Sequence, residues 1–467
     1  MDLDELQHSE SYRDRVSTVT EKGARNWVYA LKPHGRYYNY RNILTIFYLL
    51  VFFGLPFIKV NGMPFVQFNI PEGKFILFSK IFWPQDFYIF AIATITFIIF
   101  IALFTVVYGR LFCGWVCPQT IFMELIFRPI EWLIEGSPAE QRLMDNGKWT
   151  GKKIGKKIVK HLIFILIAFL IANTFLSYIF GVSRLIKIIE EPISEHLALF
   201  LGLIVFTGMF YAVFAFVREL VCTTICPYGR LQGVLFDKDT MLVAYDYKRG
   251  EGRAKFKKNE VRTAGDCIDC HQCVNVCPTG IDIRNGTQLD CTNCTACIDA
   301  CDFMMEKVGL QKGLIRYASE NGIAEGKKLA FTPKIKAFTI LLVILLAILT
   351  VLLVTRKDVD AHITRTAGQL YQELPDNKLS NLYNAKIINK TKKEFKAELK
   401  LENVKGEIKL IGGHALNLKA ETLNEVTFFV ILDRKEIHQR KNNVTIAVFR
   451  EGEKIQTVKT NFLGPFL

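Results

Sequence analysis

The sequence predicts a multi-domain membrane protein: an α-helical transmembrane bundle of five spans, an inserted cysteine-rich domain and a C-terminal β-sandwich. Three observations lead to this fold class. Five long apolar segments interrupt the 467-residue chain, eight cysteines fall within the 35 residues Cys267–Cys301, and the chain after about Arg356 alternates polar and apolar residues with period two. A chain of this length has room for two or three units.

The apolar segments are predicted to be membrane spans. Four of them hold 18 or more residues without a charge, enough to cross a hydrocarbon core about 30 Å thick. The first is shorter and contains Gly54 and Pro56, so the pattern does not fix its end. The long polar segment before it argues against an N-terminal signal peptide. The five segments are Ile43–Ile58, Phe87–Tyr108, Leu162–Gly181, Leu197–Val217 and Ala337–Val354.

Lysine and arginine in the flanks of the spans predict the orientation. Residues 1–41 hold seven and 109–160 hold nine, whereas 59–86 and 182–196 hold three and two. Because basic residues gather on the cytoplasmic side, we expect the N-terminus, the 109–160 loop and the 218–336 insert inside, and the tail outside. These flanks also explain much of the net charge of +14, which forms no basic face, so nucleic-acid binding is not expected.

These patterns divide the chain into five expected parts. All twelve cysteines lie in parts expected to face the cytoplasm. Disulfides are rare in a reducing cytosol, so these thiols are expected to be metal ligands or redox-active groups. The parts are a cytoplasmic N-terminal segment (1–41), four transmembrane helices with two short cysteine motifs (42–227), a cytoplasmic cysteine-rich domain (228–334), a fifth transmembrane helix (335–355) and an exported antiparallel β-sandwich (356–467).

The cysteine-rich insert repeats one spacing twice. Its first run has the C-x2-C-x2-C-x3-C-P spacing of bacterial two-cluster ferredoxins, and its second run repeats this spacing with Asp302 in place of proline. In those ferredoxins the fourth cysteine of a run ligates the other cluster. Zinc sites, the alternative, do not need a third close cysteine. The two expected [4Fe–4S] ligand sets are Cys267, Cys270, Cys273 and Cys301, and Cys291, Cys294, Cys297 and Cys277.

Two further cysteine pairs follow the second and fourth spans in "GRLFCGWVCPQT" and "RELVCTTICPYG". Residues i and i+4 share a helix face, so Cys113 is expected beside Cys117 and Cys222 beside Cys226. If the hairpins pack side by side, all four thiols converge. Such a set suits Cu(I), a further iron–sulfur cluster or a redox dithiol, and four buried packing residues are the alternative.

Basic residues flank both of these motifs. Arg110 and Arg230 are expected to lower the pKa values of the neighbouring thiols and so to favour the metal-binding thiolate. The chain has no Walker loop, no GxGxxG between strand and helix and no available CxxCH, so a nucleotide, a flavin or a c-type haem is not expected.

The two CxxxCP motifs, the double ferredoxin run, the fifth span and a closing β-domain ending in "FLGPF" together resemble the cytochrome c oxidase accessory proteins of the CcoG/FixG type. The resemblance implies a multi-pass protein of the bacterial inner membrane, with a cytoplasmic ferredoxin domain and a periplasmic immunoglobulin-like tail.

The resemblance also implies a function. It implies electron transfer in the assembly of a cbb3-type cytochrome c oxidase, and an enzyme that reduces Cu(II) to Cu(I) for copper delivery. The oxidase or its copper chaperones would be partners, and the eight insert cysteines would hold two [4Fe–4S] clusters. The catalytic and possible copper-binding residues would be Cys113, Cys117, Cys222 and Cys226.

Two other functions are compatible with these motifs. A membrane quinol dehydrogenase similarly joins four spans, CxxxCP pairs and two clusters, and passes electrons to a periplasmic reductase. A non-catalytic oxidase assembly scaffold would use its clusters only for stability. The fifth span and the exported β-domain favour the oxidase accessory function. The electron donor, a quinol or a cytoplasmic reductant, and the side of copper release stay open.

Overall fold

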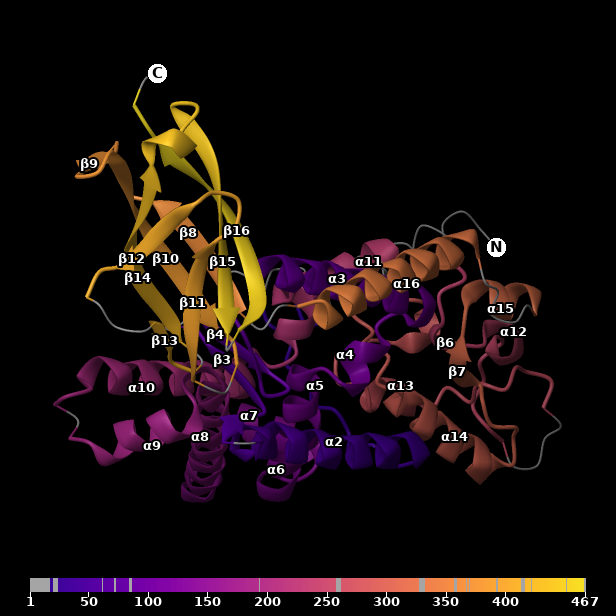
Figure 1. Cartoon of the computed structure of the whole chain (residues 1–467). Helices are drawn as coiled ribbons and strands as arrows, with labels where there is room; N and C mark the ends of the chain where they lie inside the picture. Colours follow the sequence, from indigo (N-terminus) through magenta and orange to yellow (C-terminus); the bar gives the residue numbers. More distant parts are fainter. Residues whose placement is uncertain are drawn as a thin grey trace. The chain divides into compact units, whose positions relative to one another are not determined.

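Figure 1 shows the computed structural model of the chain. The chain divides into two compact units, Met1–Leu349 and Thr350–Leu467, and each has its own hydrophobic core. The structure describes residues 17–19, 24–60, 62–70, 73–83, 86–192, 194–257, 262–326, 332–356, 359–366, 368, 370–391, 394–412, 416–420, 422–450 and 452–465.

Five helices in the described part of the chain are long and apolar enough to cross a membrane, as the sequence predicts. The first begins at Arg36 rather than at Ile43, because the carboxylate of Asp299 accepts hydrogen bonds from the N–H groups of Tyr37 (3.2 Å) and Tyr38 (2.8 Å) in its first turn. The five are α2 (Arg36–Gly54) continued by η1 (Leu55–Phe57), α3 (Phe87–Tyr108), α8 (Gly151–Phe180), α10 (Leu197–Ala212) continued by η4 (Val213–Val217), and α16 (Pro333–Val354).

Short elements join the spans at both ends. The π-helical turns η3, η4 and η5 lie at or near the end that carries the cysteine pairs, and such turns are frequent at functional sites. At this end the elements are α4 (Leu111–Trp115), α5 (Pro118–Phe122), η3 (Met123–Phe127), α6 (Arg128–Ile134), α7 (Pro138–Asn146), η5 (Val221–Ile225) and α11 (Pro227–Leu235). At the other end they are β1 (Lys59–Val60), β2 (Met63–Pro64), β3 (Val66–Asn69), β4 (Lys74–Leu77), β5 (Lys80–Phe82) and α9 (Val182–Glu190).

An aromatic core holds η3 against the third and fourth spans. The ring of Phe127 stacks on Phe214 of η4 at 4.5 Å and meets Phe164 of α8 edge-on at 4.8 Å. All three side chains are buried. Because only the short helix α5 separates η3 from the first cysteine pair, this packing fixes the position of that pair relative to the bundle.

The cysteine-rich insert is built on a two-stranded antiparallel sheet of β6 (Leu242–Tyr245) and β7 (Ile315–Ala318). The sheet brings the two ends of the insert together, and buried apolar residues such as Ile298 and Met305 pack around the thiols. The helices are α12 (Tyr247–Gly250), α13 (Gln272–Asn275), η6 (Ile283–Asn285), α14 (Ala296–Val308) and α15 (Glu320–Glu325).

The described part of the N-terminal segment ties the insert to the membrane bundle. The N–H of Leu31 donates to the carbonyl of Asn275 in the insert (2.8 Å). One residue earlier, the carbonyl of Ala30 accepts from the indole of Trp132 in the bundle (3.2 Å). The segment is therefore part of the structure that carries the cysteines.

The C-terminal unit is the predicted antiparallel β-sandwich. One sheet has the strand order β12-β14-β10-β8, with β9 paired to β10, and the other has the order β13-β11-β15-β16. Phe428, Val430 and Leu432 of β14 are buried at every second position, and Phe428 stacks on Tyr383 at 5.7 Å. The strands are β8 (Val359–Arg365), β9 (Gln372–Leu374), β10 (Lys378–Asn389), β11 (Phe395–Leu401), β12 (Gly406–Leu410), β13 (Leu416–Leu418), β14 (Leu423–Asp433), β15 (Lys441–Arg450) and β16 (Glu453–Leu463), with η7 (Arg434–Glu436) before β15.

Candidate iron–sulfur and thiolate sites

The two cysteine runs repeat a backbone conformation as well as a spacing. In each run the residue before and the residue after the second cysteine have positive φ: Asp269 (53°) and His271 (55°) in the first, Asn293 (55°) and Thr295 (67°) in the second. Asp, Asn and His adopt this conformation more readily than most residues, whereas the β-branched Thr295 does so rarely. The two turns therefore present three thiols each in the same local arrangement.

The first run lies beside the last cysteine of the second. The thiols of Cys273, Cys270 and Cys267 all act to raise the pKa of Cys301, to which burial makes the largest contribution. Cys301 lies in α14, which contains the last two cysteines of the second run. These four thiols lie together and match the donor set of a [4Fe–4S] cluster.

The second run surrounds a cavity with the last cysteine of the first. Cys277, Cys291, Cys294 and Cys297 line this cavity, together with Cys273 of the first run. Burial is the main cause that raises the pKa of Cys297, and the thiols of Cys294, Cys291, Cys277 and Cys273 add to it. The second run and Cys277 together offer the four thiols that a second [4Fe–4S] cluster needs, and these thiols would lose their protons when they bind it.

The four remaining cysteines converge at the end of the bundle. Cys117 and Cys226 both act on the pKa of Cys113, and Cys117 and Cys113 both act on that of Cys222. The convergence expected from side-by-side hairpins is therefore present. The two cysteines of a pair do not lie on one continuous helix face, however, so that expectation is wrong.

A proline directly after each pair starts a new helix at that point. Cys113 lies in α4, but Cys117 is the N-cap of the next helix, which begins at Pro118. In the second motif Cys222 lies in η5 and Cys226 caps α11. Proline has no N–H and is favoured at the first position of a helix, so each CxxxCP motif is a helix end followed by a new helix start.

Burial, rather than the nearby arginine, dominates the acidity of these thiols. It raises the pKa of Cys113 to about 11 and that of Cys222 to about 12, although the charge of Arg110 acts in the opposite direction on both. Arg230 is exposed. Arg110 thus lowers the pKa of both thiols, as expected, but burial outweighs it, and a soft metal ion would have to displace the protons. The expected effect of Arg230 stays a prediction.

The four-thiol site touches the loop of the second ligand set. A Cβ placed on Gly114 would lie 2.4 Å from the carbonyl oxygen of Thr292, which stands between Cys291 and Cys294. Arg110 donates to the carbonyl of Cys222 (3.0 Å) and also to that of Leu289. The two cysteine systems are thus in backbone contact and share a buried cation.

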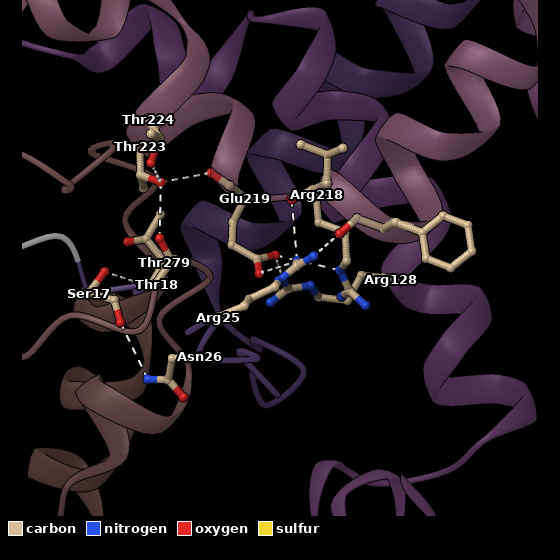
Figure 2. Close-up of polar contacts among 12 residues, drawn as sticks. Ser17, Thr18, Arg25, Asn26, Arg128, Arg218, Glu219, Thr223, Thr224 and Thr279 are labelled. Carbon is tan, nitrogen blue, oxygen red and sulfur yellow. Dashed lines mark hydrogen bonds and ion pairs between the residues drawn. The ribbon is translucent and has the colours of Figure 1, made fainter. Parts of the chain in front are cut away.

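A cluster of buried charges, which sequence reasoning missed, lies close to Cys222. Figure 2 draws Arg25, Arg128, Arg218 and Glu219 of this cluster. Arg218 makes a bidentate pair with Glu131, both distances 2.9 Å, and lies 3.5 Å from Glu219. Glu219 also pairs with Arg25 at 3.0 Å. The "RE" before the second CxxxCP motif was a signal for these charges, because charged residues at the end of an apolar span are seldom buried without partners.

The same close-up shows how the N-terminal segment reaches this region (Figure 2). The hydroxyl of Ser17 donates to the carbonyl of Thr279 (2.6 Å), and the hydroxyls of Thr18 and Thr223 lie 3.2 Å apart. Thr279 follows Cys277, and Thr223 follows Cys222. One short segment therefore holds the insert and the second cysteine pair together.

Family models match three parts of the chain. A 4Fe-4S dicluster domain matches residues 217–320, a 4Fe-4S binding domain matches residues 90–157, and the Ig-like fold at the C-terminus of FixG matches residues 349–465. The first range contains all eight cysteines of the insert, and the second contains Cys113 and Cys117.

Three known proteins are similar over most of the chain. Protein RdxB of Cereibacter sphaeroides is 33% identical over 69% of this chain and 69% of its own length, and protein RdxA of the same organism is 32% identical over 75% and 76%. The nitrogen fixation protein FixG of Rhizobium meliloti is 28% identical over 66% and 60%. A crystal structure of a FixG-related protein from Vibrio parahaemolyticus covers 24% of this chain with a TM-score of 0.21, too low to bear on the fold.

Proposed function

Because this chain belongs to the FixG-type family of membrane ferredoxins, together with RdxA and RdxB, we propose that its electron path ends at the four thiols of the CxxxCP motifs. The family match supports membrane electron transfer through [4Fe–4S] centres. The more specific proposal is that these thiols reduce Cu(II) to Cu(I), for copper delivery to a cbb3-type oxidase.

One observation carries the proposal: the four thiols converge in contact with the loop of the second ligand set. Gly114 packs on the Thr292 carbonyl, between two of the cysteines that line the cavity. When bound, a [4Fe–4S] cluster supplies single electrons. The short protein path from this loop to Cys113 therefore gives such an electron an acceptor site close to its source.

The chemistry of the thiols favours copper as the substrate. Soft thiolates prefer Cu(I) over the harder divalent ions, so a four-thiol site stabilises the reduced product. The step would need one electron for each Cu(II) reduced to Cu(I), and a reduced [4Fe–4S] cluster held by the insert cysteines would supply it and lose one electron. The buried charges around Arg218 and the N-terminal segment hold the motifs in position for it.

The ligand sets and the orientation belong to the same proposal. Cys267, Cys270 and Cys273 with Cys301 would hold one cluster, and Cys291, Cys294 and Cys297 with Cys277 the other. The cysteine-bearing end would face the bacterial cytoplasm, as the basic flanks favour, and the β-sandwich the periplasm. The oxidase or its copper chaperones would be the partners, with a quinol or a cytoplasmic reductant as donor.

A further [4Fe–4S] cluster at the four thiols is the second candidate. The 4Fe-4S binding domain matched over residues 90–157 favours it, because this range contains Cys113 and Cys117. Anaerobic iron and sulfide analysis distinguishes a copper site from a third cluster at the four thiols. Two four-iron clusters require about eight iron atoms per chain and a third raises this to about twelve.

The test of copper reduction uses the full-length protein in detergent, reduced and then freed of excess reductant without air. Cu(II) is added with a Cu(I)-specific chromophore. We expect Cu(I) from the wild type, none from a Cys113→Ser/Cys117→Ser variant that keeps its iron, and little from Cys270→Ser, which damages the electron source. Wild-type copper binding and reduction by the double variant would show that these cysteines are packing residues.

A further inference from the structure

A pocket of about 290 Å³ lies at the end of the membrane bundle opposite the cysteine pairs. It is lined by the C-terminal end of α8, the start of α9 and strand β3. α8 has 30 residues and rises about 45 Å, which separates the pocket from the cysteine-bearing end. Its volume is close to the lower limit of small-ligand pockets, about 300 Å³. The electron path does not use this region.

The side chains that line the pocket are basic, polar or apolar. Lys59 and Arg184 both line it, and no described residue of its wall is acidic. The ammonium group of Lys59 lies 3.4 Å from the hydroxyl of Ser183, which places this charge at the start of α9. The charged residues of the described wall are thus both basic, which favours an anion over a cation.

The start of α9 adds backbone donors. Gly181, at φ 81°, is the N-cap of this nine-residue helix, and no side chain caps the first turn. The N–H groups of Val182 and Ser183 have no hydrogen-bond partner among the residues that the structure describes. A helix N-terminus of this kind carries partial positive charge and binds phosphate and similar anions.

A buried amide points to the same place. Gln67 of β3 is only 8% exposed and lines the pocket, and its side chain makes no hydrogen bond within the described residues. A Cβ on Gly181 would lie 2.9 Å from its Nε2 atom, so the amide stands at the first turn of α9. Buried amides are nearly always hydrogen-bonded, and this one therefore points to a missing partner.

We propose that this pocket binds a phosphate-type anion, carried either by a lipid headgroup or by free phosphate. The Gln67 amide, the N–H groups at the start of α9 and the ammonium group of Lys59 converge as donors, which matches an anion with several acceptor oxygens. The apolar walls supplied by Pro56 and Phe180 suit the ester end of a lipid. The end of a membrane span also lies at the depth of the headgroups.

Native mass spectrometry of the full-length protein in detergent tests the proposal with three probes: phosphatidylglycerol, diacylglycerol with the same chains, and inorganic phosphate. We expect phosphatidylglycerol to bind and diacylglycerol not to bind at this site. Lys59→Gln and Gln67→Leu each remove one donor and should weaken binding roughly tenfold. Lys187→Gln removes a charge from the exposed face of the same helix, outside the pocket, and should leave binding unchanged.

The set of probes that bind identifies whether the anion comes from a lipid headgroup or from free phosphate. If inorganic phosphate binds with the same sensitivity to Lys59→Gln and Gln67→Leu, the site recognises free phosphate as well as the headgroup. Iron content equal to that of the wild type confirms that the variants fold. Equal phosphatidylglycerol binding by the wild type and both pocket variants, or binding of neither phosphate probe, would overturn the proposal.

Discussion

Gly114 is the residue at which the two cysteine systems meet. It lies between Cys113 and Cys117 in the sequence, yet its nearest neighbours are the backbone atoms of Thr292 and Asn293. Only a residue without a side chain allows this approach, because backbone atoms cannot rotate away from an added methyl group.

Gly114→Ala is therefore expected to push α4 away from the loop of the second ligand set. Overpacking of this kind costs about 1–3 kcal/mol, and we expect slower Cu(II) reduction with iron content close to wild type. The control is Gly208→Ala in α10, where an added Cβ meets nothing within 4 Å. Equal reduction rates for Gly114→Ala and the wild type would show that the close approach does not matter for electron transfer.

The buried charges around Arg218 make a second prediction at this scale. Arg218→Gln leaves the buried carboxylate of Glu131 without its bidentate partner, and such a loss costs about 3–5 kcal/mol. A lower Tm in detergent is expected. Lys312→Gln, which removes an exposed pair with Glu306, should change stability by less than about 1 kcal/mol. A Tm equal to that of the wild type for Arg218→Gln would contradict a stabilising role.

At the scale of elements, strong periodicity and length made most features predictable. The uncharged apolar runs predicted five spans, and alternation predicted β11 to β16. β10 was harder, because most of its residues are buried on both faces and clean alternation is lost. Pro118 is visible in the sequence directly after Cys117, and it disfavours a helical conformation for that cysteine, which the i, i+4 rule does not take into account.

The orientation of the spans is tested by reporter fusions. An inside N-terminus and five spans require that a fusion after residue 330 and a fusion at the C-terminus lie on opposite sides of the membrane. A reporter active only in the cytoplasm should work at the first position, and one active only in the periplasm should work at the second. The same reporter working at both positions would refute the proposed topology.

At the scale of the whole molecule, spacing alone predicted that the eight thiols of the insert lie close together, and Cys273 lies near both groups. The division into two ligand sets stays a prediction. The contacts between the insert, the bundle and the N-terminal segment could not be predicted. They join residues far apart in the chain, such as Ser17 with Thr279, and depend on packing that no local pattern encodes. The buried charges are a part of the same packing.

The central claim is that electrons pass from the iron–sulfur centres to copper at the four thiols. Rapid anaerobic mixing of the reduced full-length protein with Cu(II) tests it most directly. The iron–sulfur absorbance is bleached in the reduced protein, so its recovery on oxidation is followed together with the formation of Cu(I). We predict that both signals rise with one rate, with one Cu(I) formed per electron lost, and that Cys113→Ser/Cys117→Ser abolishes both. Cu(I) formation while the iron–sulfur centres stay reduced, or unchanged kinetics in the double variant, would contradict the account.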